Sequence, residues 1–260
     1  MSKIAVCLFG LTGGLAGSYG KGKKLDPKIC FDNYKKFIFQ DYSIDFFIHS
    51  WSVNKKERIL NLYKPKKYII EKQKKFNKDI SNYSLEHIRY LKSNGTRKRF
   101  EYLKKKAAAI KSFFYSLSKS GEIFLKYSKK NRIKYDVVIF LRFDLFFNKE
   151  IKLNILDKKC VYVPLIKNKK DKKYISDLFF IMSPPLVKKF IKIYENVEKL
   201  VPSSTVAFKQ FFDMEKIKYK SMNLKNNDFY LYRLMKNQKK KQLNSIFSYL
   251  RERFKKNFVK

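Results

Sequence analysis

Two opposite charges follow the most apolar segment of the chain. Arg142 and Asp144 come directly after Tyr135–Leu141, in the stretch LRFDLFF. Charged groups at the end of a buried strand are costly unless they are paired or used. A guanidinium can hold a diphosphate in bidentate fashion, and a carboxylate can bind a divalent cation or a sugar hydroxyl. A structural salt bridge explains the same spacing equally well.

A glycine-rich segment follows the first apolar segment of the chain. Six glycines lie between Gly10 and Gly22, and backbone amides in such a segment can approach a phosphate closely. The segment has neither the spacing of a Walker loop nor that of a dinucleotide-binding loop. We take Gly10, Thr12, Gly13 and Gly14 as candidate phosphate contacts, with a flexible surface loop as the alternative.

The third candidate is the segment IDFFIHSW, which ends at Trp51. Strand alternation places Asp45, Phe47 and His49 on one face, so that His49 emerges near the glycine-rich segment if the two strands are neighbours. Trp51 is the only tryptophan and could stack on a base or a sugar ring. A lone histidine at a strand end is more often a hydrogen-bonded structural residue than a catalytic one.

A fourth candidate is Asp177, a carboxylate that opens the apolar segment DLFFIM. It could equally be a turn residue at a strand edge. The chain has two histidines and three widely spaced cysteines, and its sequence shows no serine–histidine pairing typical of a hydrolase. This composition argues against a hydrolytic triad, a zinc site and a disulfide framework.

Short apolar segments alternate with amphipathic ones, and this pattern predicts βαβ units and a largely parallel sheet flanked by helices, an α/β Rossmann-like fold. A long helix-prone stretch, 81–130, is expected to break near Asn94-Gly95 and Ser120-Gly121. Ser203 is expected to cap the last helix of this part of the chain. The predicted strands are 3–9, 43–49, 67–71, 135–141, 160–163 and 177–182, and the predicted helices include 27–39, 53–63 and 185–200.

The formal net charge of +39 would ordinarily suggest nucleic acid or an anionic membrane as a partner. Only nine of the 61 basic residues are arginines, and the lysines spread over the whole length beside abundant Asn, Ile, Phe and Tyr. A/T-rich codons produce this mixture, so most of the charge is interpreted as solvated surface and an RNA site as the weaker explanation. No segment approaches the roughly 18 apolar residues of a membrane span, and no cleavable leader is recognised, so a cytosolic chain is expected.

The blocks KIAVCLFG, LDPKICFDNYKKFI, DFFIHSW, LYKPKKYIIEKQ, YDVVIFLRFDLFF and SDLFFIMS together resemble a bacterial glycosyltransferase-like family. Its members are encoded with capsule and lipopolysaccharide synthesis genes, and the resemblance covers about residues 1–215. It implies a GT-A-type fold and transfer of a sugar from a nucleotide-diphosphate donor to a surface glycan. Trp51 and His49 would then lie on the donor side.

In GT-A enzymes an Asp-x-Asp motif holds a metal that bridges the donor diphosphate. The matching position here reads Arg142-Phe143-Asp144, so Mn²⁺ or Mg²⁺ remains an open expectation with Asp144 as its ligand. The resemblance also implies that Asp177 is an acceptor-side residue or base. It offers Arg97, Arg99, Tyr115 and Ser116 as weaker candidates near the donor.

The C-terminal segment 236–260 carries nine basic residues against Glu252, and its apolar residues from Leu243 to Phe258 follow a helical stripe. This pattern predicts a basic amphipathic helix beyond a transferase domain at 1–235. Such a helix suits an anionic membrane and would place the enzyme on the inner face of the cytoplasmic membrane, near a lipid-linked acceptor. Packing on the domain or in a homodimer is the alternative.

Three other functions remain compatible with these residues. The same fold could transfer a non-sugar, phosphate-derived group to capsule sugars. The incomplete acidic motif also suits a non-catalytic member of a capsule-assembly complex. The net charge suits a nucleic-acid-binding protein, although clustered arginines with exposed aromatic residues are lacking.

Overall fold

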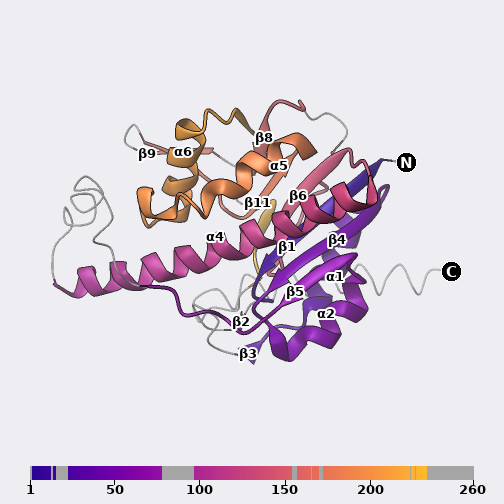
Figure 1. Ribbon diagram of the computed structural model, residues 1–260, viewed down its shortest axis with the longest axis horizontal. Helices are drawn as coiled ribbons and strands as arrows, with labels where there is room; N and C mark the ends of the chain where they lie inside the picture. Colours follow the sequence, from indigo (N-terminus) through magenta and orange to yellow (C-terminus); the bar gives the residue numbers. More distant parts are fainter. Residues whose placement is uncertain are drawn as a thin grey trace.

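A seven-stranded sheet forms the centre of the molecule (Figure 1). The computed structural model describes residues 2–12, 14–15, 23–77, 97–153, 157–164, 166–169, 172–222, 224–225 and 227–232, with the backbone alone at 14–15, 23–24, 97–105, 166–169 and 172–173. The strand order is β12-β8-β11-β6-β1-β4-β5, and β11 alone runs against the other strands. The strands are β1 (Lys3–Gly10), β4 (Ser43–Ser50), β5 (Lys67–Ile70), β6 (Val137–Arg142), β8 (Val161–Val163), β11 (Phe179–Met182) and β12 (Tyr219–Ser221).

The chain winds outward from β1 in two directions. It first adds β4 and β5 on one side of β1, and then returns to add β6 on the other side. The inner strands are continuous apolar runs buried on both faces, as expected for the centre of a parallel sheet. Strand order therefore reverses between β1 and β6.

Helices cover both faces of the sheet and divide the core in two. Helices α1 (Pro27–Phe37) and α2 (Lys56–Tyr63) pack on one face, whereas α4 (Arg97–Asn131), α5 (Pro184–Phe190) and α6 (Ser204–Met214) pack on the other (Figure 1). The predicted alternation in β4 is confirmed, because Phe47 belongs to the α4 side of the core and Phe46 to the α1 side.

Short elements complete the described part of the chain. The 3-10 helices are η1 (Val53–Lys55), η2 (Ile191–Ile193) and η3 (Val197–Lys199). Three two-stranded sheets pair β2 (Gly14–Leu15) with β3 (Lys23–Lys24), β7 (Leu145–Phe147) with β13 (Phe229–Leu231), and β9 (Ile166–Lys169) with β10 (Lys172–Ile175).

The predicted α/β fold class is confirmed, but three details of the helices were wrong. Helix α4 runs without a break through Ser120-Gly121. The glycine is there for close packing, since a Cβ on Gly121 would lie 2.4 Å from Ile191 Cγ2. The predicted helix 185–200 is α-helical only as far as Phe190, and the rest of this range contains the 3-10 helices η2 and η3. Ser203 stands at the N-cap of α6, but its side chain makes no capping hydrogen bond.

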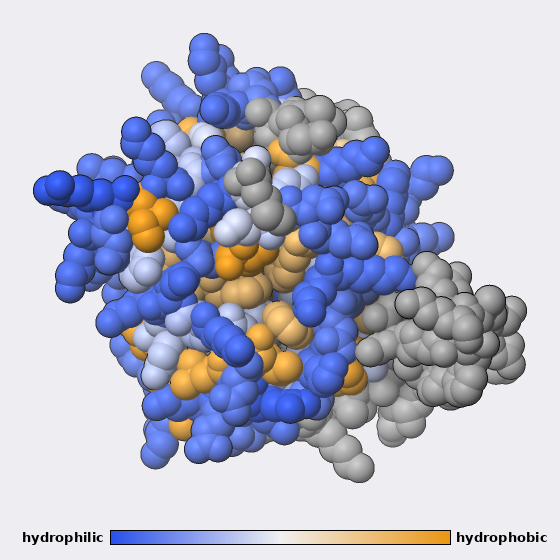
Figure 2. Space-filling model, turned by 90° about the vertical axis from the view of Figure 1, so that its right-hand side faces the viewer, coloured by the Kyte–Doolittle hydropathy of each residue, from blue (hydrophilic) through white to orange (hydrophobic). Residues whose placement is uncertain are grey.

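Hydrophilic residues dominate the face shown in Figure 2, and hydrophobic residues reach the surface between them in a narrower band. Within the described ranges, no helix is both long and apolar enough to cross a bilayer. The expected break near Asn94-Gly95 and the predicted C-terminal helix at 236–260 lie outside the described residues.

Candidate functional site

The candidate residues from three strands meet at the carboxyl edge of the sheet. Phe9 of β1 is in register with His49 of β4 on one side and with Arg142 of β6 on the other. Gly10 follows immediately and pairs with Ser50. In open α/β sheets, ligands bind outside the carboxyl ends of the strands at the point where strand order reverses. That point here lies between β1 and β6, beside Gly10 and Arg142.

Arg142 and Asp144 form a bidentate ion pair with each other. Arg142 Nε and Nη2 donate to the two carboxylate oxygens of Asp144, at 2.8 and 3.0 Å. The side chain of Asp144 is 2% exposed and that of Arg142 is 15% exposed. Burial lowers the pKa of Arg142, but the charges of Asp144 and Asp177 outweigh burial and raise it overall. Arg142 is therefore a fixed cation that keeps a small opening to solvent.

The backbone around this ion pair is tied to the core. The Tyr34 hydroxyl donates to the carbonyl of Arg142 at 2.6 Å and accepts from the N–H of Leu145 at 3.1 Å. The carbonyl of Asp144 accepts from the N–H of Tyr232 at 2.6 Å. These contacts fix the turn between β6 and β7, and with it the direction of the Arg142 side chain.

Asp177 lies before β11, on the side of the sheet that carries α6. Its Oδ2 accepts from the hydroxyl of Ser204, at the start of α6, at 2.5 Å. The negative charge of Asp177 also acts on Arg142. Arg142 is thus under the influence of two carboxylates, only one of which is directly bonded to it.

The described residues do not form a metal centre around Asp144. Both of its carboxylate oxygens accept from Arg142, so a cation at Asp144 would share this carboxylate with the guanidinium. In the part of the chain that the structure describes, no group of three or more His, Cys, Asp or Glu residues could hold a metal ion. The Mn²⁺ or Mg²⁺ site with Asp144 as its ligand stays a prediction.

The glycine-rich segment begins with a tightly anchored stretch. The carbonyl of Gly10 accepts from Ser50 Oγ at 2.9 Å and from the N–H of Trp51 at 3.2 Å. The N–H of Thr12 donates to Ser52 Oγ at 3.0 Å. The N–H of Gly10 donates to Ser116 Oγ at 2.7 Å. These two amides are already bonded within the protein, and phosphate contacts by Gly10 and Thr12 stay a prediction.

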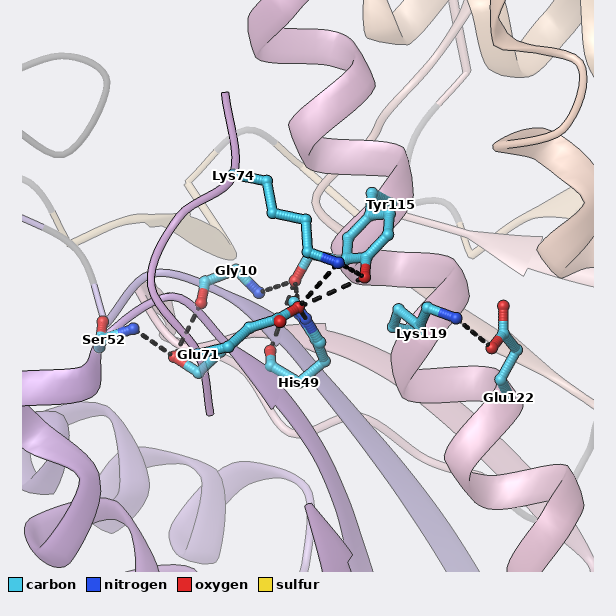
Figure 3. A network of polar contacts seen from close by, with 10 residues as sticks. Gly10, His49, Ser52, Glu71, Lys74, Tyr115, Lys119 and Glu122 are labelled. Carbon is cyan, nitrogen blue, oxygen red and sulfur yellow. Dashed lines mark hydrogen bonds and ion pairs between the residues drawn. The ribbon is translucent and has the colours of Figure 1, made fainter. Parts of the chain in front are cut away.

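A polar network lies beside Gly10 (Figure 3), with His49 and Ser116 as its buried members. His49 Nδ1 is 2.7 Å from Ser116 Oγ, and His49 Nε2 is 3.2 Å from Glu71 Oε1. Sequence reasoning missed the pairing of His49 with Ser116, because the two residues are 67 positions apart and come from different elements. Ser116 is fully buried, so this serine–histidine–carboxylate chain is not arranged for nucleophilic attack on a substrate.

Aromatic rings enclose the outer end of this network. Trp51 stacks on Tyr115 with ring centroids 5.4 Å apart, and its edge contacts with His49 and Phe76 complete the cluster. Lys74 Nζ lies 4.5 Å from the ring centroid of Tyr115 and 2.5 Å from its hydroxyl. Trp51 is 6% exposed. Its stacking partner in the described structure is thus Tyr115, and stacking on a ligand stays a prediction.

Several predicted site residues cannot be placed. Gly13 lies outside the described residues, and Gly14 is described only as backbone in β2. Arg97 and Arg99 belong to the first turn of α4, where side chains are not described.

Neither a protein-family model nor a curated protein sequence matches this chain. The solved structures that are similar at low identity include the following three. A nucleoside-diphosphate-sugar pyrophosphorylase from Vibrio cholerae RC9 has 10% identity and a TM-score of 0.43, over 93% of this chain and 99% of that chain. The PaToxG glycosyltransferase has 16% identity and a TM-score of 0.36, over 83% and 70% of the two chains. A transferase with two cysteines replaced by serine has 13% identity and a TM-score of 0.36, over 88% and 93%. Similarity this weak carries no conclusion about activity.

Proposed function

We propose that this protein is a glycosyltransferase that moves a sugar from a nucleotide-diphosphate donor to a bacterial surface glycan. The observation that carries the proposal is the position of Arg142. It is a buried, fixed cation at the reversal point of the sheet, beside the start of a glycine-rich segment. The combination of sequence blocks that resembles capsule and lipopolysaccharide glycosyltransferases supports the same function.

The protein would accelerate the proposed reaction mostly by electrostatic stabilisation and positioning. The acceptor hydroxyl attacks the anomeric carbon of the sugar, the bond from that carbon to the diphosphate oxygen breaks, and its electron pair leaves with the diphosphate. Arg142 would stabilise the charge that develops on the leaving oxygen. The carboxylate of Asp177 would accept the proton of the acceptor hydroxyl and position that group. Asp144 would hold the guanidinium in its orientation.

The proposed acceptor is a capsule or lipopolysaccharide glycan, in lipid-linked form. The basic segment 236–260 would bring the enzyme to the inner face of the cytoplasmic membrane, where such acceptors are presented. The segment is a proposed contact with anionic lipid, and a contact in a homodimer is the competing use for it.

A panel of UDP-, GDP-, ADP- and dTDP-sugars tests the proposal by thermal stabilisation of the purified protein. A donor at one hundred times its dissociation constant should add about 2.7 kcal/mol of apparent stability. Arg142→Gln should abolish the shift, whereas Arg58→Gln, which removes an exposed arginine of a similar ion pair with Asp26, should retain it. Absence of stabilisation by every member at millimolar concentration would favour a non-catalytic role. Release of the nucleoside monophosphate instead of the diphosphate in the presence of glycan would favour transfer of a phosphate-derived group.

A further inference from the structure

We propose that Ser116, His49 and Glu71 form a positioning relay that holds the backbone of Gly10, the first residue of the glycine-rich segment. Ser116 and His49 themselves do not touch the donor. The relay deepens the proposed function, because it rests on the glycine-rich segment being the donor side of the site. It changes the predicted role of His49 from a donor contact to a positioning residue.

Both backbone polar groups of Gly10, its N–H and its carbonyl, are hydrogen-bonded. Its φ of +93° lies in the region that favours glycine. Its N–H donates to Ser116 Oγ, and its carbonyl accepts from Ser50 Oγ and the N–H of Trp51. Ser116 belongs to α4, so the bond at 2.7 Å joins the end of β1 to a helix 106 residues later in the chain. The exit direction of the glycine-rich segment therefore depends on Ser116.

The chemistry of the three side chains determines where the protons lie. The Glu71 carboxylate can only accept, so His49 Nε2 carries the proton that is donated to Glu71 Oε1. In the neutral ring Nδ1 then has a lone pair, which accepts from the hydroxyl of Ser116. The Ser116 oxygen remains free to accept from Gly10. Every donor in the chain meets an acceptor, although Ser116 and His49 are buried.

Burial of His49 favours this neutral form. Burial lowers the pKa of His49, and the charges of Lys74 and Lys119 lower it further, while Glu71 opposes them. Burial raises the pKa of Glu71, but His49, Lys74 and Tyr115 outweigh burial and lower it overall. The groups that face the ring are thus Glu71 after β5, Lys74 in the following loop, and Tyr115 and Lys119 on α4.

Protonation of His49 would reverse one bond of the relay. Nδ1 would become a donor to Ser116, and the Ser116 hydroxyl would turn to the carbonyl of His49, at 3.4 Å. The Ser116 oxygen would then accept from both Gly10 and His49 Nδ1. The amide resonance of Gly10 should therefore follow the titration of His49, which a residue with a merely space-filling role would not cause.

Amide hydrogen exchange of Gly10, measured by NMR, tests the relay directly. Ser116→Ala should accelerate exchange of the Gly10 amide at least tenfold. The Thr12 amide, which bonds to Ser52, should change much less. Ser120→Ala is the matched control, because Ser120 is an equally buried serine of α4 that donates only to the Leu117 carbonyl of its own helix. Equal Gly10 exchange in the two variants would overturn the proposal.

A measurement on the unmodified protein keeps the test decisive if Ser116→Ala does not fold. Nitrogen-15 spectra of His49 should show the proton on Nε2. In a pH titration, the chemical shift of the Gly10 amide should change with the same midpoint as His49. A proton on Nδ1, or a Gly10 shift independent of His49, would contradict the relay. Thermal stabilisation by UDP and GDP distinguishes this result from the proposed function. If neither nucleotide stabilises the wild type, nucleotide binding is contradicted, and the exchange data still decide whether the relay exists. If they bind, Ser116→Ala should weaken them and Ser120→Ala should not.

Discussion

Asp144 is the residue for which the structure most changes the expected effect of a substitution. From its sequence position, Asp144→Asn is expected to abolish transfer and leave the fold intact. The structure adds a stability cost, because the amide would leave Arg142 as a largely buried, unpaired cation. Loss of one partner of a buried ion pair costs about 3–5 kcal/mol.

Urea denaturation of Asp144→Asn should therefore show a loss of this size in the free energy of unfolding. Asp32→Asn, which breaks the exposed pair with Lys28, is the control and should cost less than about 1 kcal/mol. Similar losses in both variants would show that Arg142 finds another partner when Asp144 is neutral.

Arg142→Lys tests whether the planar guanidinium is needed. The guanidinium bonds to Asp144 through Nε and Nη2, and its Nη1 would contact a phosphate. A lysine has a single amino group and cannot do both. The Michaelis constant for the donor should rise at least tenfold, which corresponds to about 1.4 kcal/mol. Arg58→Lys, at an exposed pair with Asp26, should leave it unchanged.

The same assay decides whether a metal takes part in the reaction. Since Arg142 stands where the motif has its first acid and its cation could itself neutralise the diphosphate, part of the wild-type transfer should continue in EDTA. Complete loss in EDTA, with recovery on addition of Mn²⁺ or Mg²⁺, would mean that Arg142 does not replace the metal.

At the scale of elements, the packing of α4 against the sheet depends on the absence of a side chain at Gly121. A Cβ there would lie 2.4 Å from Ile191 Cγ2 and 2.9 Å from Phe140 Cζ. Gly121→Ala should therefore destabilise the protein by about 1–3 kcal/mol, although alanine favours helix by about 1 kcal/mol. Thermal or urea unfolding measures the loss. The double variant with Ile191→Ala should lose less than the sum of the single variants, and strict additivity would refute the contact.

The central strands could be predicted because their sequences are continuous apolar runs, and Pro27 correctly marked the start of α1. The break expected at Ser120-Gly121 was wrong for a physical reason: a glycine that usually weakens a helix is required here by a neighbouring side chain. The pairing of Ser116 with His49 has no local signature, since it arises only when α4 crosses the carboxyl edge of the sheet. For Arg142 and Asp144 the spacing allowed both a ligand site and a salt bridge, and the bond between the two side chains depends on the turn after β6, which has no local sequence signature.

At the scale of the whole molecule, the proposed membrane contact of segment 236–260 can be tested independently of the donor site. Removal of residues 239–260 should leave a folded protein that no longer sediments with anionic vesicles, because several basic residues each contribute roughly 1 kcal/mol at such a surface. Neutral vesicles and added salt are the controls. Unfolding on truncation, or no binding by the full chain at low salt, would assign the segment to the core or to an interface between subunits.

The position of β1 in the middle of the sheet has a consequence for how the protein is made. Lys3 and Asp136 are hydrogen-bonded neighbours 133 residues apart, so the β6 side of β1 stays uncovered until that much more chain has left the ribosome. At synthesis rates of about 5–20 residues per second, this wait is on the order of 10 s. During it, a wholly apolar strand edge is open to other chains. The nascent protein should therefore need chaperone protection early in its synthesis, and the edge that becomes the reversal point of the sheet is the one that needs it longest.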